Sequence, residues 1–275
     1  MKKWYAVIGD PIAHSLSPFM HETWFRENGI EASYIPVHVE PSKLKQAYES
    51  LELLGASGFN VTLPHKQAII PLLDGIDETA SMMDAVNTVV RSGRSFKGTN
   101  TDGDGFVESL RTANPSGNSK ILLIGAGGAA RGISFALKRG GFEDVTITNR
   151  TYRRAEELAF ESSSKVMLKA EAERKLGDFD IIIQTTSVGL AEDEALPIAL
   201  DNVRSGALAA DIVYNPIETP FLKVAEQKGC MTLNGVGMFV YQGAIAFEKW
   251  TGIKPDTENM IQMITEKLGG TYVNR

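Results

Sequence analysis

The chain has a single cysteine, Cys230, and therefore cannot form an internal disulfide. It has no run of apolar residues long enough to span a bilayer as a helix. The first residues turn acidic at Asp10, too soon for a secretory signal peptide. These absences lead us to expect a cytoplasmic protein without a membrane partner.

Acidic residues outnumber basic ones, 34 to 28, and the chain has only four histidines. The net charge is −6 and the isoelectric point is about 5.4, whereas a nucleic-acid partner would favour a basic face. The histidines lack the carboxylate or cysteine partners of a metal site. They are His14, His21, His38 and His65. We therefore expect neither a nucleic-acid partner nor a bound metal.

The remaining composition is that of a globular protein. Hydrophobic residues make up 43% of the 275 residues and charged residues 23%. This length suffices for one large or two ordinary domains. Strand-like and helix-like segments alternate in both halves of the sequence, which predicts an α/β fold.

A glycine-rich segment follows a buried strand near the middle of the chain. Residues 121–124 form an unbroken apolar run, as expected of a strand covered on both faces of a parallel sheet. The segment Gly125-Ala-Gly-Gly-Ala-Ala130 follows and leads into a helical pattern. In this context the spacing is that of a dinucleotide site, where Gly125 permits the turn and Gly127 lets backbone N–H groups approach a pyrophosphate. The alternative is a simple tight turn, and the next strand decides between the two.

That next strand ends at Asn149, 24 residues beyond Gly125. NAD-binding chains usually place an acidic residue near this position for the ribose 2′-hydroxyl. Here Asn149 is followed by Arg150, Arg153 and Arg154, and arginine forms charge-assisted bonds to a 2′-phosphate. The alternative is that these arginines are ordinary solvated charges at an exposed helix start. That alternative does not explain why positive charge gathers at a helix N-terminus, where the helix dipole disfavours it. NADP is therefore the predicted cofactor.

The first hundred residues contain polar side chains at the ends of predicted strands. Ser17-Pro18 is a helix-start signal, with Ser17 as the N-cap, and Ser15 lies just before it. Residues 58–64 predict a strand with Phe59, Val61 and Leu63 on one face and Asn60 and Thr62 on the other, and Lys66 follows. Asp102 lies in a Thr-Asp-Gly segment, where we expect a turn, and a helix is predicted over 104–111.

The predicted division of the chain places a linker at residues 114–118. A long helix is predicted from Met238 and a last helix from residues 254–256, and we expect both to fold back onto the first domain. The predicted substrate-binding and catalytic domain is 1–113 together with 238–275. The predicted Rossmann-type cofactor domain is 114–237.

Several segments, in order along almost the full length, resemble the shikimate dehydrogenase family. They are Ser15-Leu-Ser-Pro18, Asn60-Val-Thr-Leu-Pro-His-Lys66, Ala85-Val-Asn-Thr88, Gly98-Thr-Asn-Thr-Asp-Gly103, residues 125–131, Asn149-Arg-Thr151, Tyr214-Asn-Pro216 and residues 235–244. The family reduces 3-dehydroshikimate to shikimate with NADPH, in the pathway toward aromatic amino acids. The resemblance implies this reaction and NADP as cofactor. We expect a monomer or a homodimer.

The resemblance also implies roles for individual residues. Lys66 and Asp102 resemble the catalytic pair that passes a proton to or from the reacting oxygen. The implied substrate-binding residues are Ser15 and Ser17, for a carboxylate, and Asn60, Thr62, Asn87, Tyr214 and Gln242. The implied cofactor-binding residues are Gly125, Ala126, Gly127, Gly128, Ala129, Asn149, Arg150, Thr151, Arg154, Thr185, Thr186, Ser187, Gly235 and Met238, the last beside the nicotinamide.

Two other functions are compatible with these residues. A quinate/shikimate dehydrogenase using NAD stays within the family, and Arg150 and Arg154 argue against NAD without excluding quinate. A non-catalytic shikimate-binding or regulatory module is the second alternative. The presence of both Lys66 and Asp102 argues against it, because a binding module does not need a proton-transfer pair.

Overall fold

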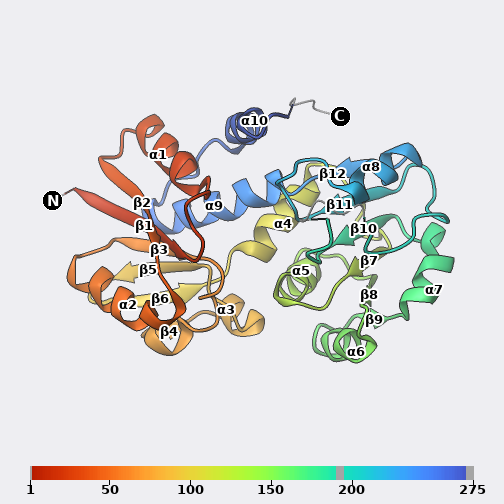
Figure 1. Cartoon of the computed structure of the whole chain (residues 1–275), viewed down its shortest axis with the longest axis horizontal. Helices are drawn as coiled ribbons and strands as arrows, with labels where there is room; N and C mark the ends of the chain where they lie inside the picture. Colours follow the sequence, from red (N-terminus) through yellow and green to blue (C-terminus); the bar gives the residue numbers. More distant parts are fainter. Residues whose placement is uncertain (1, 190–194, 271–275) are drawn as a thin grey trace. The chain divides into compact units, whose positions relative to one another are not determined.

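The computed structural model describes residues 2–189 and 195–270 (Figure 1). The chain divides into two compact units, here called the first and the second unit. The first unit is Met1–Thr101 with Gln242–Met260, and the second is Asp102–Tyr241 with Ile261–Arg275. Each unit contains a six-stranded sheet, so the predicted α/β fold is confirmed. The domain boundaries expected from the sequence stay a prediction.

The first unit is built on a mixed sheet with the strand order β2-β1-β3-β5-β6-β4. Strand β1 pairs in parallel with β2 and β3, whereas β5 is antiparallel to both β3 and β6. The elements are β1 (Lys3–Gly9), α1 (Ser17–Glu27), β2 (Ala32–His38), η1 (Pro41–Lys43), α2 (Leu44–Leu53), β3 (Gly58–Val61), η2 (Ile70–Leu72), β4 (Gly75–Ile76), α3 (Glu78–Met83), β5 (Thr88–Ser92) and β6 (Ser95–Thr99).

Alternate residues of this sheet face two different environments. Ala6, Ile8 and Phe59 belong to an apolar core that also contains Leu44 and Leu51 of α2. The residues that alternate with these, such as Val7, face the opposite side of the sheet. There the β1–β3 register places Val7 beside Asn60. One face of the sheet therefore packs on α2, and the other, called the polar face, carries Asn60 beside buried aromatic rings such as those of Tyr5 and Tyr34.

Three local predictions for this part of the chain are wrong. Leu16, not Ser17, is the N-cap of α1, and Ser17 is the first helical residue, with its N–H donating to Ser15 Oγ at 3.3 Å. Strand β3 ends at Val61, so Leu63 lies beyond the sheet and is 71% exposed instead of sharing the buried face. Helix α4 begins at Asp102, so the Thr-Asp-Gly segment starts a helix and does not form a separate turn.

The second unit contains an all-parallel sheet with the strand order β9-β8-β7-β10-β11-β12. Numbered along the chain from β7, this is the 3-2-1-4-5-6 order of the Rossmann fold. The elements are α4 (Asp102–Arg111), β7 (Ile121–Ile124), α5 (Gly128–Arg139), β8 (Val145–Thr148), α6 (Tyr152–Glu161), β9 (Lys165–Val166), α7 (Lys169–Arg174), η3 (Leu176–Asp178), β10 (Ile181–Gln184), β11 (Leu208–Asp211), α8 (Pro220–Gln227) and β12 (Met231–Leu233).

Helices cover both faces of this second sheet, with α5 on one side and α7 and α8 on the other (Figure 1). Ile121 and Leu123 of β7 contribute to the core beneath α5, and Leu122 and Ile124 to the core beneath α8. Every residue of β7 is therefore buried, which explains the unbroken apolar run in its sequence.

Two of the sequence boundaries between the two units fall within two C-terminal helices. Helix α9 (Val236–Thr251) begins before the predicted Met238, and α10 (Thr257–Lys267) follows it. Within the first unit, Trp250 Nε1 donates to the carbonyl oxygen of Val89 at 3.0 Å, and Trp24 Nε1 donates to that of Asp256 at 3.0 Å. Residues 242–260 are thus bound to the first sheet and to α1.

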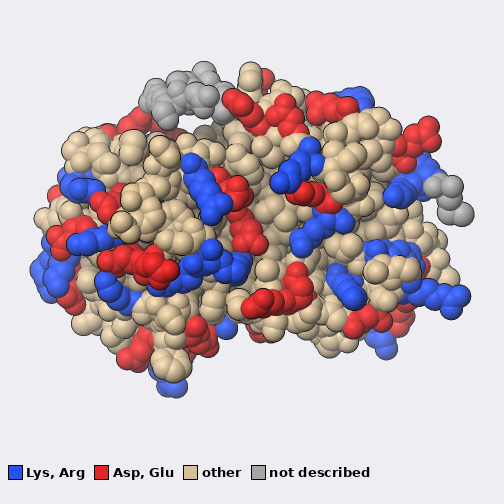
Figure 2. Space-filling view, turned by 180° about the vertical axis from the view of Figure 1, so that it is seen from behind, with Lys and Arg blue, Asp and Glu red and all other residues tan. Residues whose placement is uncertain are grey.

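The surface of the described residues has mixed charge. Figure 2 shows acidic and basic side chains interspersed over the face that it presents. Among the helices of residues 2–189 and 195–270, none has the length and apolar character needed to cross a membrane.

Candidate active site

The glycine turn after β7 lies at the point where the strand order of the second sheet reverses. Gly125 has a φ of +122°, and its N–H donates to the carbonyl oxygen of Thr148 in β8 at 2.8 Å. A Cβ at Gly125 would lie 2.4 Å from Thr185 Oγ1, in the loop after β10. Both the backbone conformation and the close approach therefore require glycine here. Ligands of open α/β sheets bind at such a switch point.

The helix that follows presents an uncapped N-terminus. Gly127 is the N-cap of α5 and supplies no side-chain bond, and the first turn contains no acidic residue. A Cβ at Gly127 or Gly128 would meet no atom within 4 Å, so the backbone of this turn borders open space. Bare N–H groups at a helix start favour an anion, and the residues present therefore fit a dinucleotide pyrophosphate.

The strand next to this turn ends at the arginine cluster. Asn149 Nδ2 donates to the carbonyl oxygen of Thr151, the N-cap of α6, at 3.0 Å. Arg153 pairs with Glu157 one helical turn later, with Nε and Oε1 3.0 Å apart. Among the described residues, the exposed side chains of Arg150 and Arg154 have no ion-pair partner. These two side chains are available to an anionic ligand, as NADP requires.

Two further loops contribute predicted cofactor residues at the same sheet edge. Gln184, at the end of β10, fixes the loop after it, because its Oε1 accepts from the Thr186 N–H at 3.0 Å. Thr185 is buried, and its hydroxyl donates to the carbonyl oxygen of Ile124 at 2.7 Å, while Ser187 is exposed. Gly235 is sterically required, since a Cβ there would lie 2.2 Å from the carbonyl oxygen of Ile212.

The polar face of the first sheet carries a connected group of neutral side chains. Asn60 Nδ2 donates to the carbonyl oxygen of Asn87 at 3.1 Å and to Thr88 Oγ1 at 3.0 Å. Asn87 Nδ2 donates to Thr101 Oγ1 at 2.9 Å and lies 3.5 Å from Gln242 Oε1. Three predicted substrate-binding residues, Asn60, Asn87 and Gln242, are therefore brought together. Thr88 and Thr101, which lie in recognised motifs but had no predicted role, take part in the same hydrogen bonds.

The other predicted substrate residues occupy loops and helix starts. Ser15 is half-buried and Ser17 is buried at the beginning of α1. Thr62 follows β3, and its N–H donates to the carbonyl oxygen of Ile8 at 3.0 Å. In the second unit, the ring of Tyr214 stacks on Phe239, with centroids 4.8 Å apart.

The two predicted catalytic residues are both half-buried, Lys66 in the first unit and Asp102 in the second. The backbone carbonyl of Lys66 accepts from the Val86 N–H at 2.8 Å, which places Lys66 beside the segment that carries Asn87. The preceding residue, His65, is buried, and its Nε2 lies 2.6 Å from the carbonyl oxygen of Val39. His65 therefore anchors the loop that presents Lys66.

Asp211, at the end of β11, is a buried acid that the sequence reading missed. Its carboxylate accepts from the Val213 N–H at 3.0 Å and from the Thr219 hydroxyl at 2.8 Å. Burial raises the pKa of this carboxyl to about 6, against the smaller opposing effect of these hydrogen bonds. A single polar residue closing a buried apolar strand is the signal that could have indicated it. Asp211 holds the loop that carries Tyr214.

The raised pKa predicts that Asp211 makes the folded state less stable as the pH rises. The unfolded carboxyl ionises near 3.8 and the folded one near 6, so the folded state binds more protons between these values. The free energy of unfolding should therefore fall across this interval, by on the order of 3 kcal/mol. Asp211→Asn keeps an acceptor for Val213 and cannot ionise, so this fall should disappear.

Urea unfolding of the wild type and Asp211→Asn at about pH 4 and about pH 7 measures this effect. The variant should gain stability relative to the wild type at the higher pH. A difference between the two proteins that is the same at both pH values would show that Asp211 ionises normally.

Comparison with known proteins identifies the same two regions. Residues 7–89 match the family model described as shikimate dehydrogenase substrate binding domain. Residues 109–216 match shikimate / quinate 5-dehydrogenase, and residues 235–263 match the shikimate 5'-dehydrogenase C-terminal domain. The matched regions contain most of the side chains described above.

Individual relatives extend over the whole chain. The shikimate dehydrogenase (NADP(+)) of Lysinibacillus sphaericus is 53% identical, covering 98% of this chain and 100% of its own. The structure of shikimate 5-dehydrogenase from Thermus thermophilus in complex with NADP(H) and shikimate has a TM-score of 0.89 at 35% identity, over 96% of this chain and 99% of that one. Quinate dehydrogenase from Corynebacterium glutamicum in complex with NAD has a TM-score of 0.88 at 28% identity, over 96% and 99%.

Proposed function

Because the chain belongs to the shikimate dehydrogenase family, we propose that it catalyses the reversible NADPH-dependent reduction of 3-dehydroshikimate to shikimate. The observation that carries this proposal is the joint presence of two sites. One is the polar group of Asn60, Asn87 and Gln242 in the region that matches the family's substrate-binding domain. The other is the anion-binding turn at Gly125 in the Rossmann unit.

The cofactor supplies the hydride when it is bound. The N–H groups of Gly127 and Gly128 would bind its pyrophosphate, because they lie at the uncapped N-terminus of α5, beside open space. Arg150 and Arg154 would bind the 2′-phosphate, and their exposure without an ion pair among the described residues supports this role. The remaining predicted cofactor residues are Ala126, Ala129, Asn149, Thr151, Thr185, Thr186, Ser187, Gly235 and Met238.

Lys66 and Asp102 are the proposed catalytic pair. Reduction of a ketone builds negative charge on its oxygen, and a protonated Lys66 both stabilises that charge and donates the proton. In the reverse direction the neutral amine takes the proton back. Asp102 would orient the ammonium group and accept a hydrogen bond from the substrate. The anchoring of the Lys66 loop by buried His65 supports a fixed position for this side chain.

Neutral side chains suit the proposed substrate, which is rich in hydroxyl groups. Asn60, Thr62, Asn87 and Gln242 would contact the ring hydroxyls, and a site built in this way rejects analogues that lack them. Tyr214 is a further proposed substrate-binding residue. Ser15 and Ser17 would hold the carboxylate from the start of α1. The hydrogen bonds that join Asn87 to Gln242 and Asn60 support a shared surface for the ring.

An assay of the purified chain with shikimate or quinate, each with NADP or NAD, tests this function. Formation of NADPH from shikimate is the expected result. Preferential oxidation of quinate with NAD would favour the quinate dehydrogenase alternative, which the likeness to the Corynebacterium glutamicum enzyme keeps open. Shikimate binding without turnover would favour the non-catalytic module.

We also propose that the protein is cytoplasmic and forms a monomer or a homodimer, without a nucleic-acid or membrane partner. Its single cysteine is buried as a free thiol, which suits a reducing compartment. Light scattering coupled to size-exclusion chromatography would determine the oligomeric state.

A further inference from the structure

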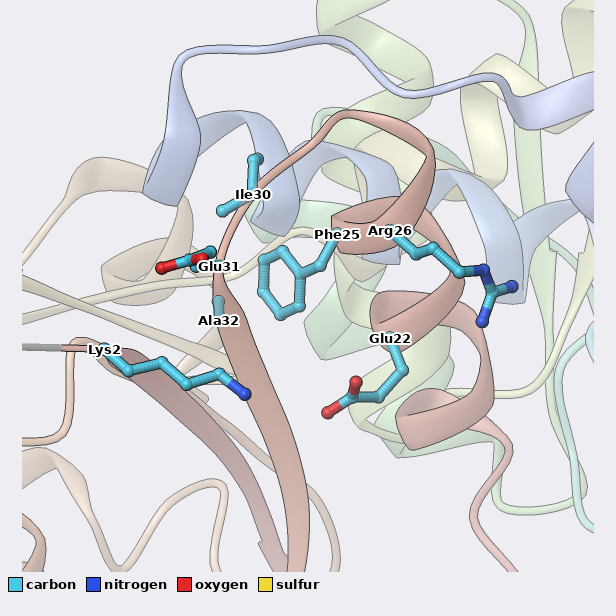
Figure 3. A pocket seen from close by; sticks show the side chains of 7 residues that line it. All are labelled: Lys2, Glu22, Phe25, Arg26, Ile30, Glu31 and Ala32. Carbon is cyan, nitrogen blue, oxygen red and sulfur yellow. The ribbon is translucent and has the colours of Figure 1, made fainter.

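Tyr34 lies on the polar face of the first sheet, although no sequence motif singled it out. It stands opposite Tyr5 in the β1–β2 register, and only 2% of its surface is exposed. Its backbone N–H donates to Glu22 Oε1 at 2.5 Å, and Figure 3 shows this carboxylate of α1 turned toward β2. The backbone of Tyr34 is thereby tied to the helix that begins at Ser17.

Aromatic packing holds the ring of Tyr34. The centroid of the His21 ring lies 4.4 Å from that of Tyr34, with an angle of 14° between the ring planes. The centroid of the Trp250 ring lies 6.2 Å away. Burial lowers the pKa of His21 to about 3, so the stacked imidazole is neutral at physiological pH. The position of the Tyr34 hydroxyl is therefore set by packing as well as by hydrogen bonds.

The orientation of the Asn60 amide determines where the proton of Tyr34 points. Asn60 Nδ2 lies within hydrogen-bond distance of the Asn87 carbonyl oxygen and of Thr88 Oγ1. A carbonyl oxygen only accepts, so the amide nitrogen must face it, and both amide hydrogens are used within the protein. Asn60 Oδ1 therefore faces Tyr34, whose hydroxyl donates to it across 2.6 Å.

The Tyr34 phenol keeps its proton. Burial raises the pKa of Tyr34 well above 10. The phenol is therefore neutral at physiological pH, and its one proton is committed to Asn60 Oδ1. Tyr34 thus holds a residue that is proposed to contact the substrate.

We infer that Tyr34 is a positioning residue that holds the side-chain oxygen of Asn60 in place. The inference rests on the proposed function, in which Asn60 meets a ring hydroxyl. Both amide hydrogens of Asn60 are committed within the protein. Asn60 can therefore bind a substrate hydroxyl only by accepting a hydrogen bond from it, through the remaining lone pair of Oδ1. The orientation of Asn60 therefore makes the site selective for a hydrogen-bond donor at that ring position, and Tyr34 holds the accepting oxygen there.

Tyr34→Phe tests this inference, because it keeps the stacked ring and removes only the hydroxyl. The KM for shikimate should rise about fivefold to twentyfold, the effect of one hydrogen bond, while kcat changes less than about threefold. NADP affinity and the melting temperature should match those of Tyr48→Phe. Tyr48 is the matched control, since it is a buried tyrosine in the core on the other face of the sheet.

A double-mutant cycle identifies the residue through which Tyr34 acts. In an Asn60→Ala background, Tyr34→Phe should change the calorimetric Kd for shikimate by less than about threefold. Equal KM values for Tyr34→Phe and Tyr48→Phe would overturn the inference, as would the same loss with and without Asn60. A matching loss of NADP affinity would assign Tyr34 a merely structural role. A wild type that fails to oxidise shikimate would instead contradict the proposed function.

Discussion

Lys66→Met should lower kcat by about 10²–10⁴-fold, the contribution typical of a positioned general acid–base group. The KM for shikimate should change much less, because the interaction of the ammonium with the reacting oxygen strengthens in the transition state. Lys66→Arg should also be poor, since a guanidinium stays charged and cannot take the proton back in the reverse reaction. Steady-state kinetics in both directions measures these effects.

Lys97→Met provides the matched control, because Lys97 is exposed on β6 of the same unit. It should leave kcat unchanged, and NADP binding should be normal in both variants. Asp102→Asn should share part of the Lys66 defect, and the double variant should lose less than the product of the two single losses. Near-normal kcat in Lys66→Met would remove the proton-transfer role from this lysine.

Arg150→Ala and Arg154→Ala should each raise the KM for NADPH by about ten- to a hundredfold. This estimate follows from about 1.5–3 kcal/mol for a hydrogen bond to a charged group. The constants for NADH should barely move, because NADH has no 2′-phosphate for these side chains to bind. Kinetics with both cofactors therefore measures the change as a loss of preference for NADPH.

Arg153→Ala is the control for this cofactor prediction. It removes an arginine from the same helix start, but one that is already paired with Glu157. Its preference for NADPH over NADH should remain that of the wild type. If Arg150→Ala and Arg154→Ala also retain the wild-type preference, the 2′-phosphate is bound elsewhere.

The Rossmann unit could be predicted well because its signals are local in sequence. The buried run before Gly125 and the glycine spacing after it lie within a few residues of each other, and the structure confirms strand, turn and helix. Helix α8 also begins with a local signal, with Thr219 as its N-cap and Pro220 as its first residue. Asp211 was missed although it ends a buried apolar run, because its bond to Thr219 depends on how the following loop folds.

The polar face of the first unit could be predicted only in part. Asn60, Asn87 and Gln242 were recognised from motifs, but the contacts that join them come from strand register. Tyr34 and Asn60 are 26 residues apart and meet only because β1 lies between their strands. The predicted N-cap of α1 was wrong by one residue, because Ser17-Pro18 marks a helix start without fixing which residue is the first helical one.

All three tryptophans of the chain lie in the first unit, which has a spectroscopic consequence. The indole N–H groups of Trp4, Trp24 and Trp250 each donate to a backbone carbonyl oxygen of that unit. Tryptophan emission during denaturation therefore reports the loss of the first unit alone, whereas far-ultraviolet circular dichroism follows the helices and strands of both. Coincident curves would show that the two units unfold as one cooperative body, and separated curves that the Rossmann unit melts independently.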